Sequence, residues 1–419
     1  MAKISVKDAS MTIFIARQPI FDRKKQVYAY ELLYRSDMVN RAHVLNDEYA
    51  TLKVIANGLL IGLQRLTIGK RAFIHFNRLL LMGQIPLLFP KELLGVEIFE
   101  TVKPEERIIR VCERIKKAGY LMVMDDFVLA EPYRQLLPFA DMIKIDFLGN
   151  SPEERRSIAE DAFAQKLTLL AEKIETQTDY DEALDLGCLY FQGFFFQKPD
   201  LVSRREMPGY KLNYLHILRK IHDPVLQMKD IEGIIKRDVS LTYKLMRFIN
   251  SASFGFRVSV RSVEHALMLL GKREIKKWLT IIVMSGIGRE KPPELMSAAV
   301  VRARFCELIA ADFKLYKEPA EFFLMGMFSL MEAFLDRPIA EILEELPLED
   351  NVKAALLGED VWFNDVLKLV KAFEKAQWEP VCQYAQQLKL DEEKLAILYL
   401  EAVEWTKFLT KTDQEEKSA

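Results

Sequence analysis

The chain has 419 residues, of which 50% are hydrophobic, and a formal net charge of −2. This length is more than one hydrophobic core usually serves, so we expect two domains. The hydrophobic content argues against extensive disorder, and the small net charge argues against a general attraction to nucleic acid or to anionic membranes. The four cysteines, Cys112, Cys188, Cys306 and Cys382, are far apart. This spacing argues against a disulfide framework or a structural zinc site and favours the reducing cytoplasm.

Neither targeting nor membrane insertion is indicated by the sequence. Residues 1–10 are polar and charged, unlike the apolar core of a signal peptide. The most apolar later run, 278–287, is shorter than the roughly 20 residues that span a bilayer. We therefore expect a cytoplasmic protein without a membrane span.

In the first half, apolar strand-like runs repeatedly end in a polar residue where the chain turns. These runs are 28–31, 73–77, 96–100, 121–126, 142–146, 167–172 and 188–192. Segments with helical spacing of apolar residues lie among them, at 47–63, 105–118 and 152–164. Such alternation predicts parallel strands joined by right-handed crossovers. The number of repeats favours a (β/α)₈ barrel, with an open doubly wound sheet as the alternative.

These patterns divide the chain into a barrel over residues 12–200, a proline-containing linker over 201–210 and an all-helical domain over 211–410. Residues 411–419 are expected to fray. The fold class is therefore an α/β barrel followed by an all-α domain. The helices predicted in the second half are 240–249 with Ser240 as N-cap, 263–270 ended by Gly271, 300–313, 320–335 and 394–408.

The polar strand ends have the chemistry of a metal site. In a barrel of this kind the active site lies at the carboxyl ends of the strands, and Mg²⁺ and Mn²⁺ prefer oxygen ligands. Adjacent carboxylates suit two metal ions, which together activate water and stabilise an in-line phosphoryl displacement. Each residue alone is more often a solvated or salt-bridged strand end, but the set together favours a site. The candidate ligands are Glu31, Asn77, Glu97, Asp125 and Asp126, with Glu172 and Glu175 in or near the same shell.

Two basic residues lie on the same strands. Lys144 would hold the attacking water or offset charge on a phosphate. His75 is two residues from Asn77 and therefore on the same face of its strand. It either lines the site or packs inside the barrel.

The same residues resemble the signature of EAL domains. Gln18-Pro19-Ile20 and then Glu31-Leu32-Leu33-Tyr34-Arg35 match it, with Leu32 where the family usually has alanine. The resemblance covers roughly residues 12–200, and several motifs in order make it specific. The further matches are Asn77, Glu97-Ile98-Phe99-Glu100, Asp125-Asp126-Phe127, Lys144-Ile145-Asp146, Ala171-Glu172-Lys173-Ile174-Glu175-Thr176 and Gln192-Gly193-Phe194-Phe195-Phe196.

The resemblance implies a barrel that hydrolyses the bacterial second messenger cyclic di-GMP to a linear dinucleotide with two Mg²⁺ or Mn²⁺ ions. It also implies roles for particular residues. Lys144 and Glu175 would assist the attacking water, Gln18, Arg35 and Gln192 would contact substrate or close the site, and Glu100 would support a neighbouring loop. The implied metal ligands are Glu31, Asn77, Glu97, Asp125, Asp126 and Glu172.

One segment departs from the family. Where EAL domains have Phe-Gly-x-Gly after the paired aspartates, this chain has Phe127-Val128-Leu129-Ala130, followed by Pro132. Without the glycines, positive φ angles become costly in this loop. The ligands favour a slow phosphodiesterase, whereas the loop favours a catalytically silent receptor or protein-interaction scaffold. Both interpretations stay open, and so does the hydrolysis of another phosphodiester. In the family this loop is coupled to dimerisation, so a homodimer is possible as well.

The second half resembles an HDOD domain, a helical relative of the HD phosphohydrolases that lacks their chemistry. The matching segments are 238–250 and 262–271, and the resemblance covers roughly 205–400. An HD hydrolase needs several His and Asp ligands, but the last histidine is His265, and 326–331 stands where the His-Asp pair is expected. His222-Asp223 is interpreted as a helix-end pair. We expect this domain to bind a protein partner, without direct nucleic-acid binding.

Overall fold

The structure is a computed structural model that describes residues 13–36, 63, 65–98, 102–125, 133–197, 208–250, 260–315, 319–359 and 361–406. Its contacts separate two compact units, Met1–Lys198 with Lys371–Glu404, and Pro199–Val370 with Trp405–Ala419. The sequence predicted one helical domain over 211–410, whereas the contacts group Lys371–Glu404 with the barrel. No helix in the described ranges is both long and apolar enough to cross a membrane.

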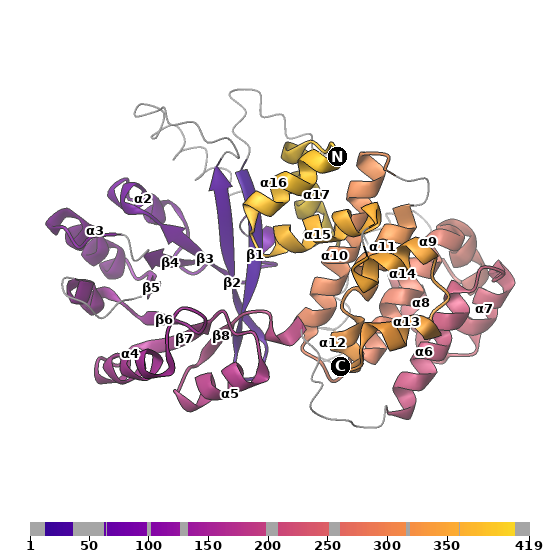
Figure 1. The fold of residues 1–419 in the computed structure, drawn as a ribbon, viewed down its shortest axis with the longest axis horizontal. Helices are drawn as coiled ribbons and strands as arrows, with labels where there is room; N and C mark the ends of the chain where they lie inside the picture. Colours follow the sequence, from indigo (N-terminus) through magenta and orange to yellow (C-terminus); the bar gives the residue numbers. More distant parts are fainter. Residues whose placement is uncertain are drawn as a thin grey trace. The chain divides into compact units, whose positions relative to one another are not determined.

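Eight strands close into a barrel in the order β1 to β8 (Figure 1). From β2 to β8, each neighbouring pair is parallel, as the strand–helix alternation predicts. β1 differs, because it runs antiparallel to both β2 and β8. The strands are β1 Ile13–Asp22, β2 Val27–Ser36, β3 Arg71–Phe76, β4 Leu94–Ile98, β5 Leu121–Met124, β6 Met142–Asp146, β7 Thr168–Glu172 and β8 Tyr190–Gln192.

A tight turn explains the antiparallel first strand. The Asp22 carboxylate accepts hydrogen bonds from the backbone N–H groups of Lys24 at 2.8 Å and Gln26 at 2.9 Å. Lys25 adopts a left-handed φ of 57°. Such a turn reverses the chain within a few residues, and a parallel connection would need a crossover of a dozen or more residues.

Helices connect the remaining strands along the outside of the barrel (Figure 1). The helices predicted at 105–118 and 152–164 are confirmed as α3 Glu106–Lys117 and α4 Pro152–Ala164. The one predicted at 47–63 lies almost wholly outside the described residues. The other connections are α2 Arg78–Met82, α5 Gln177–Asp185 and the 3₁₀ segments η1 Ile85–Leu88 and η2 Tyr133–Phe139, and a third 3₁₀ segment, η3 Phe195–Gln197, follows β8.

The barrel interior is layered by the two-residue period of its strands. A buried apolar cluster, Ile20, Ala29, Phe73, Val123, Met142 and Leu170, fills one level of the barrel. On the five of these strands that run parallel, β2, β3, β5, β6 and β7, the residue two positions further along is polar: Ala29 precedes Glu31, for example, and Phe73 precedes His75. Because alternate residues share one face of a strand, the polar layer lies directly beyond the apolar layer. The alternation of residues along each strand therefore places a charged layer next to the buried apolar cluster, which forms an apolar floor beneath it.

The second unit is helical. α8 begins at Val239, but its N-cap is Asp238, whose side chain accepts a hydrogen bond from the N–H of Leu241; the prediction of Ser240 as the cap was wrong. Gly271, with a φ of 74°, breaks the helical path inside α9, which confirms the predicted end of a helix there. The helices are α6 Gly209–His222, α7 Met228–Lys236, α8 Val239–Ile249, α9 Val263–Ile287, α10 Pro293–Asp312, α11 Pro319–Phe328, α12 Met331–Leu335, α13 Ile339–Glu345, α14 Asp350–Leu357 and α15 Trp362–Glu374.

The division between the units falls within α15. The two helices that follow, α16 Trp378–Gln387 and α17 Glu392–Trp405, lie in the segment that groups with the barrel, apart from the last residue of α17. Arg65, just before β3, forms an ion pair with Glu404 in α17, which joins this segment to the barrel.

Candidate functional site

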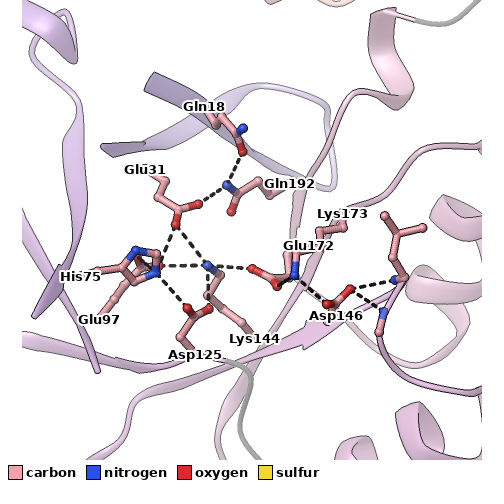
Figure 2. Close-up of polar contacts among 12 residues, drawn as sticks. Gln18, Glu31, His75, Glu97, Asp125, Lys144, Asp146, Glu172, Lys173 and Gln192 are labelled. Atoms are coloured by element: carbon pink, nitrogen blue, oxygen red, sulfur yellow. Dashed lines mark hydrogen bonds and ion pairs between the residues drawn. The ribbon is translucent and has the colours of Figure 1, made fainter. Parts of the chain in front are cut away.

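Six charged side chains from six consecutive parts of the barrel converge at the carboxyl ends of its strands (Figure 2). Because β2 to β7 are parallel, their carboxyl ends meet at one mouth. The six are Glu31 on β2, His75 on β3, Glu97 on β4, Asp125 directly after β5, Lys144 on β6 and Glu172 on β7.

Lys144 lies at the centre of this group and is only 1% exposed. Its Nζ is 2.8 Å from Glu172 Oε2, 2.9 Å from Asp125 Oδ1, and 3.4 Å from one oxygen each of Glu31 and Glu97. Burial by itself would lower the pKa of Lys144, but the four carboxylates together raise it well above its ordinary value. Lys144 is therefore a fixed positive charge.

His75 is a second positive group within the same layer. Its Nε2 lies 2.8 Å from Asp125 Oδ2, 3.1 Å from Glu97 Oε2 and 3.2 Å from Glu31 Oε1. Burial lowers the pKa of His75, and Glu97, Asp125 and Glu31 more than offset this and raise it to about 9. Of the two interpretations left open by the sequence, the structure therefore supports the one in which His75 lines the site.

The four carboxylates outnumber the two positive groups. Burial raises the pKa of Glu97 to about 8 and that of Glu172 to about 7, despite the nearby Lys144. The pKa of Asp125 is lowered, because Lys144 and His75 more than offset its burial, and the pKa of Glu31 is lowered as well. Burial thus favours the protonated forms of Glu97 and Glu172, and further positive charge beside them would favour the ionised forms.

Several buried oxygens in this layer accept no hydrogen bond from the residues that the structure describes. They include both carboxylate oxygens of Glu97 and Oδ1 of Asp125, which form ion pairs with Lys144 and His75 without the geometry of a hydrogen bond. Buried charged oxygens are costly unless they are paired or coordinate a metal. One ligand atom each from Glu31, His75 and Glu97 lies within 4.8 Å of the others. This donor set, rich in hard oxygens, fits a divalent cation.

Two amides border the carboxylates. Nε2 of Gln192 donates hydrogen bonds to Oε1 of Gln18 at 3.1 Å and to Oε2 of Glu31. Strand register brings them together, since Gln18 on β1 pairs with Glu31 and Ile20 on β1 pairs with Gln192 on β8. The antiparallel first strand thus contributes Gln18 to the mouth.

The segment after β7 fixes the rim of the site. The backbone N–H groups of Glu175 and Thr176 donate hydrogen bonds to the Asp179 carboxylate, at 3.2 and 2.8 Å, within the capping box that begins α5. The N–H of Ile174 donates to the carbonyl of Gln192 at 3.0 Å. These bonds hold Glu172, Glu175 and Gln192 in a fixed relation.

A cavity of about 420 Å³ opens above the charged layer. This volume is in the range that accommodates small-molecule ligands. Two of its lining residues, Lys375 and Gln377, come from the segment that links α15 to α16 and groups with the barrel. The Lys375 ammonium lies 5.4 Å from the ring centroid of Phe194, another lining residue. The other polar lining residues are Gln18, Glu31, His75, Asp125, Lys144, Glu172, Lys173, Glu175 and Gln192.

Most of the predicted site residues meet here. Glu97 belongs to the charged layer, and Gln18, Glu31, Asp125, Lys144, Glu172, Glu175 and Gln192 line the cavity. Asn77 is exposed, and its Oδ1 caps α2 by accepting a hydrogen bond from Leu80 N–H at 3.0 Å. Its assignment as a metal ligand stays a prediction. Asp126, Glu100 and the side chain of Arg35 lie outside the described residues, as does the altered loop 127–132.

The helical unit supplies no comparable cluster in the part of it that the structure describes. α6 ends at His222 with Asp223 as its C-cap, which confirms the helix-end interpretation of the His-Asp dipeptide. His222 is buried and 2.9 Å from the Thr280 hydroxyl, and burial with nearby Lys276 lowers its pKa to about 3. At the position predicted to replace the catalytic pair, a Cβ on Gly326 would lie 2.6 Å from the backbone of Ala303. Close helix packing occupies that position.

Comparison with known proteins identifies both halves of the chain. The family model of the EAL domain matches residues 85–199, and that of the HDOD domain matches residues 207–335. YuxH of Bacillus subtilis (strain 168) is 37% identical over 404 residues, which cover 94% of this chain and 98% of YuxH. Cyclic di-GMP phosphodiesterase CdgJ of Vibrio cholerae serotype O1 is 33% identical over 406 residues, which cover 96% of this chain and 94% of CdgJ.

Solved structures match the first half. One is the manganese and cyclic di-GMP complex of Klebsiella pneumoniae BlrP1 at pH 6, which is 22% identical, with a TM-score of 0.37, over 45% of this chain and 56% of that chain. YuxH and CdgJ match this chain along nearly its whole length, and the two family models match successive parts of it. The chain belongs to the family in which an EAL domain is joined to an HDOD domain.

Proposed function

We propose that the barrel is a cyclic di-GMP phosphodiesterase that depends on two Mg²⁺ or Mn²⁺ ions, and that the helical domain is a non-catalytic regulator that binds a protein partner. One observation carries the proposal: four buried carboxylates surround Lys144 beneath a cavity large enough for a ligand. The name of the Vibrio relative, which matches along nearly its whole length, adds the substrate.

The proposed ligands of the ions are Glu31, Asn77, Glu97, Asp125, Asp126 and Glu172. When bound, such ions supply a nucleophilic water at neutral pH and stabilise the charge that develops on phosphate oxygens. Hydrolysis forms one phosphorus–oxygen bond to water and breaks another, so one ribose hydroxyl is released and the cyclic dinucleotide becomes linear.

The other residues of the cavity would bind and orient the reactants. The buried Lys144 ammonium forms ion pairs within the charged layer and would offset negative charge brought by a phosphate. Glu175, at the rim, would accept a hydrogen bond from the attacking water. Gln18 and Gln192, already joined by a hydrogen bond, would close one side of the site, and Arg35 would contact a substrate phosphate.

A second candidate function is a catalytically silent receptor or scaffold. The observation that favours it is the loss of both family glycines after Asp126, together with Pro132. In addition, Lys144 and His75 neutralise part of the charge of the carboxylates, so the layer does not depend on metal alone for compensation.

Hydrolysis of cyclic di-GMP by the purified full-length chain tests the proposal. We expect slow formation of the linear dinucleotide with Mg²⁺ or Mn²⁺, none with chelator, and loss of turnover in Glu31→Gln. The matched control is Glu113→Gln, on the outer surface of α3, where the carboxylate pairs only with Lys117 among the described contacts. That variant should retain the wild-type rate.

Calorimetric titration with cyclic di-GMP separates the alternatives. Binding without turnover would support the receptor. Neither binding nor turnover in the folded protein would refute both nucleotide functions and leave the interaction scaffold.

A further inference from the structure

His75 lies in the charged layer at a position where the surrounding carboxylates favour a cation. Its Nε2 faces oxygens from three other parts of the barrel, at 2.8 Å from Asp125, 3.1 Å from Glu97 and 3.2 Å from Glu31 (Figure 2). These three carboxylates are all predicted metal ligands. An imidazole nitrogen in their midst is within reach of any ion that they hold. Since a coordinating imidazole is neutral, binding of the ion would release the Nε2 proton to solvent.

The backbone fixes this orientation. Strand register pairs His75 on β3 with Glu97 on β4, and His75 shares its strand face with Phe73 in the apolar floor. The imidazole therefore points into the barrel and above the floor, because its neighbours Ile74 and Phe76 take the opposite face. Its side chain is 12% exposed, which leaves it little freedom to turn away.

The donor atoms are close enough to share one ion. The ligand atoms of Glu31, His75 and Glu97 lie within 4.8 Å of one another. Two ligands on opposite sides of one ion are separated by about twice the metal–ligand distance, or roughly 4.2 Å for bonds of about 2.1 Å. Small side-chain adjustments would thus bring all three onto one ion.

We propose that His75 is a direct nitrogen ligand of one of the divalent ions, and that it shifts the selectivity of that position from Mg²⁺ toward Mn²⁺ and other transition metals. The inference rests on the proposed metal-dependent function. Its physical basis is that Mg²⁺ favours oxygen donors, whereas imidazole is a good ligand for first-row transition metals. Glu31, Glu97 and Asp125 would provide the oxygen ligands that both kinds of ion accept.

Pulsed electron paramagnetic resonance on Mn²⁺ tests the bond directly. Full-length protein is stripped with chelator and loaded with less than one equivalent of Mn²⁺, without nucleotide. A ¹⁴N coupling to Mn²⁺ is expected in the wild type and should disappear in His75→Asn. His265→Gln, at an exposed position in α9, is the matched control and should keep the coupling.

Competition between the two metals gives the second readout. Titration of Mg²⁺ into the Mn²⁺-loaded protein measures the ratio of the Mn²⁺ affinity to the Mg²⁺ affinity. This ratio should be about 10- to 100-fold lower in His75→Asn than in the wild type. The wild-type spectrum needs no variant, so a folding defect in His75→Asn would not remove the test.

The outcomes distinguish this inference from the proposed function. Bound Mn²⁺ without ¹⁴N coupling would overturn the role of His75, while hydrolysis in Mg²⁺ would still support the phosphodiesterase. An unchanged affinity ratio in a folded His75→Asn protein would overturn the selectivity. Failure of the wild type to bind Mn²⁺ would overturn the inference as a whole.

Discussion

Replacing Lys144 with methionine removes the central positive charge of the barrel mouth and keeps a side chain of similar length. In the wild type, the Lys144 ammonium contacts four carboxylates at 2.8 to 3.4 Å and is 1% exposed. In the variant, His75 would be the positive group left beside Glu31, Glu97 and Asp125. Among its described ion pairs, Glu172 would keep the one with the half-exposed Lys173, at 3.4 Å. Removing one partner of a buried ion pair leaves an uncompensated charge.

The expected loss is about 3–5 kcal/mol of unfolding free energy for the metal-free protein. For a unit of this size, it corresponds to a decrease of roughly 6–20 °C in melting temperature. The loss should depend on pH, since the pKa values of Glu97 and Glu172, already about 8 and about 7, rise further without Lys144. The folded variant then holds protons that the unfolded chain releases above its ordinary carboxyl pKa of 4.5, so its stability falls as pH increases.

Thermal melting of the full-length protein in chelator at pH 6 and pH 8 measures this effect. We expect Lys144→Met to be less stable at pH 8 than at pH 6 and to gain more from added Mn²⁺ than the wild type. A ligand at 100 times its Kd stabilises by about 2.7 kcal/mol. The control is Lys117→Met at the exposed Lys117 of α3, whose pairing with Glu113 should contribute about 1 kcal/mol or less.

Near-identical melting of Lys144→Met and wild type in chelator at pH 8 would refute the reasoning. It would show that the four carboxylates do not need Lys144 and that the charged layer is solvated or protonated without metal. A variant destabilised equally at both pH values would retain the packing argument and refute the electrostatic one.

Two further predictions concern other parts of the chain. The pKa of buried His222 is about 3, against an ordinary 6.5, so only the unfolded chain takes up its proton between these values. The contribution of His222 to the free energy of unfolding is fully present above pH 6.5 and is lost below it, by about 2 kcal/mol at pH 5. Urea unfolding should show that His222→Gln lacks this pH dependence. Equal dependence of the unfolding free energy on pH in the variant and the wild type would contradict the prediction. A Cβ at Gly193, where φ is 151°, would lie 2.0 Å from the carbonyl oxygen of Ile174. Gly193→Ala should therefore cost about 1–3 kcal/mol and weaken Mn²⁺ binding, whereas Gly209→Ala, where a Cβ meets nothing within 4 Å, should behave like wild type in melting and metal titration.

Local patterns in the sequence were sufficient for much of the fold. Helical periodicity located α3 and α4, and the run of residues before Gly271 located a helix end, because each depends on neighbours a few positions apart. Local pattern failed at the start of α8, where both Asp238 and Ser240 can cap a helix and only the folded backbone selects Asp238.

The site was predictable in its parts and not in its geometry. Polar residues at successive strand ends indicated one mouth, since parallel strands must bring their carboxyl ends together. The sequence left His75 undecided, because period-two spacing gives the face of a strand but not the neighbours across the barrel. Only the pairing of β3 with β2 sets His75 within 3.2 Å of Glu31, which lies on the preceding strand.

The sequence by itself determined which residues are polar or apolar on each strand face, and hence that a charged layer would follow an apolar floor. Tertiary structure decided the rest: the antiparallel entry of β1, the association of Lys371–Glu404 with the barrel, and the meeting of Lys144 with four carboxylates. These features join residues far apart in the chain. Their free energies depend on burial and on distances that exist only after folding, so no local pattern encodes them.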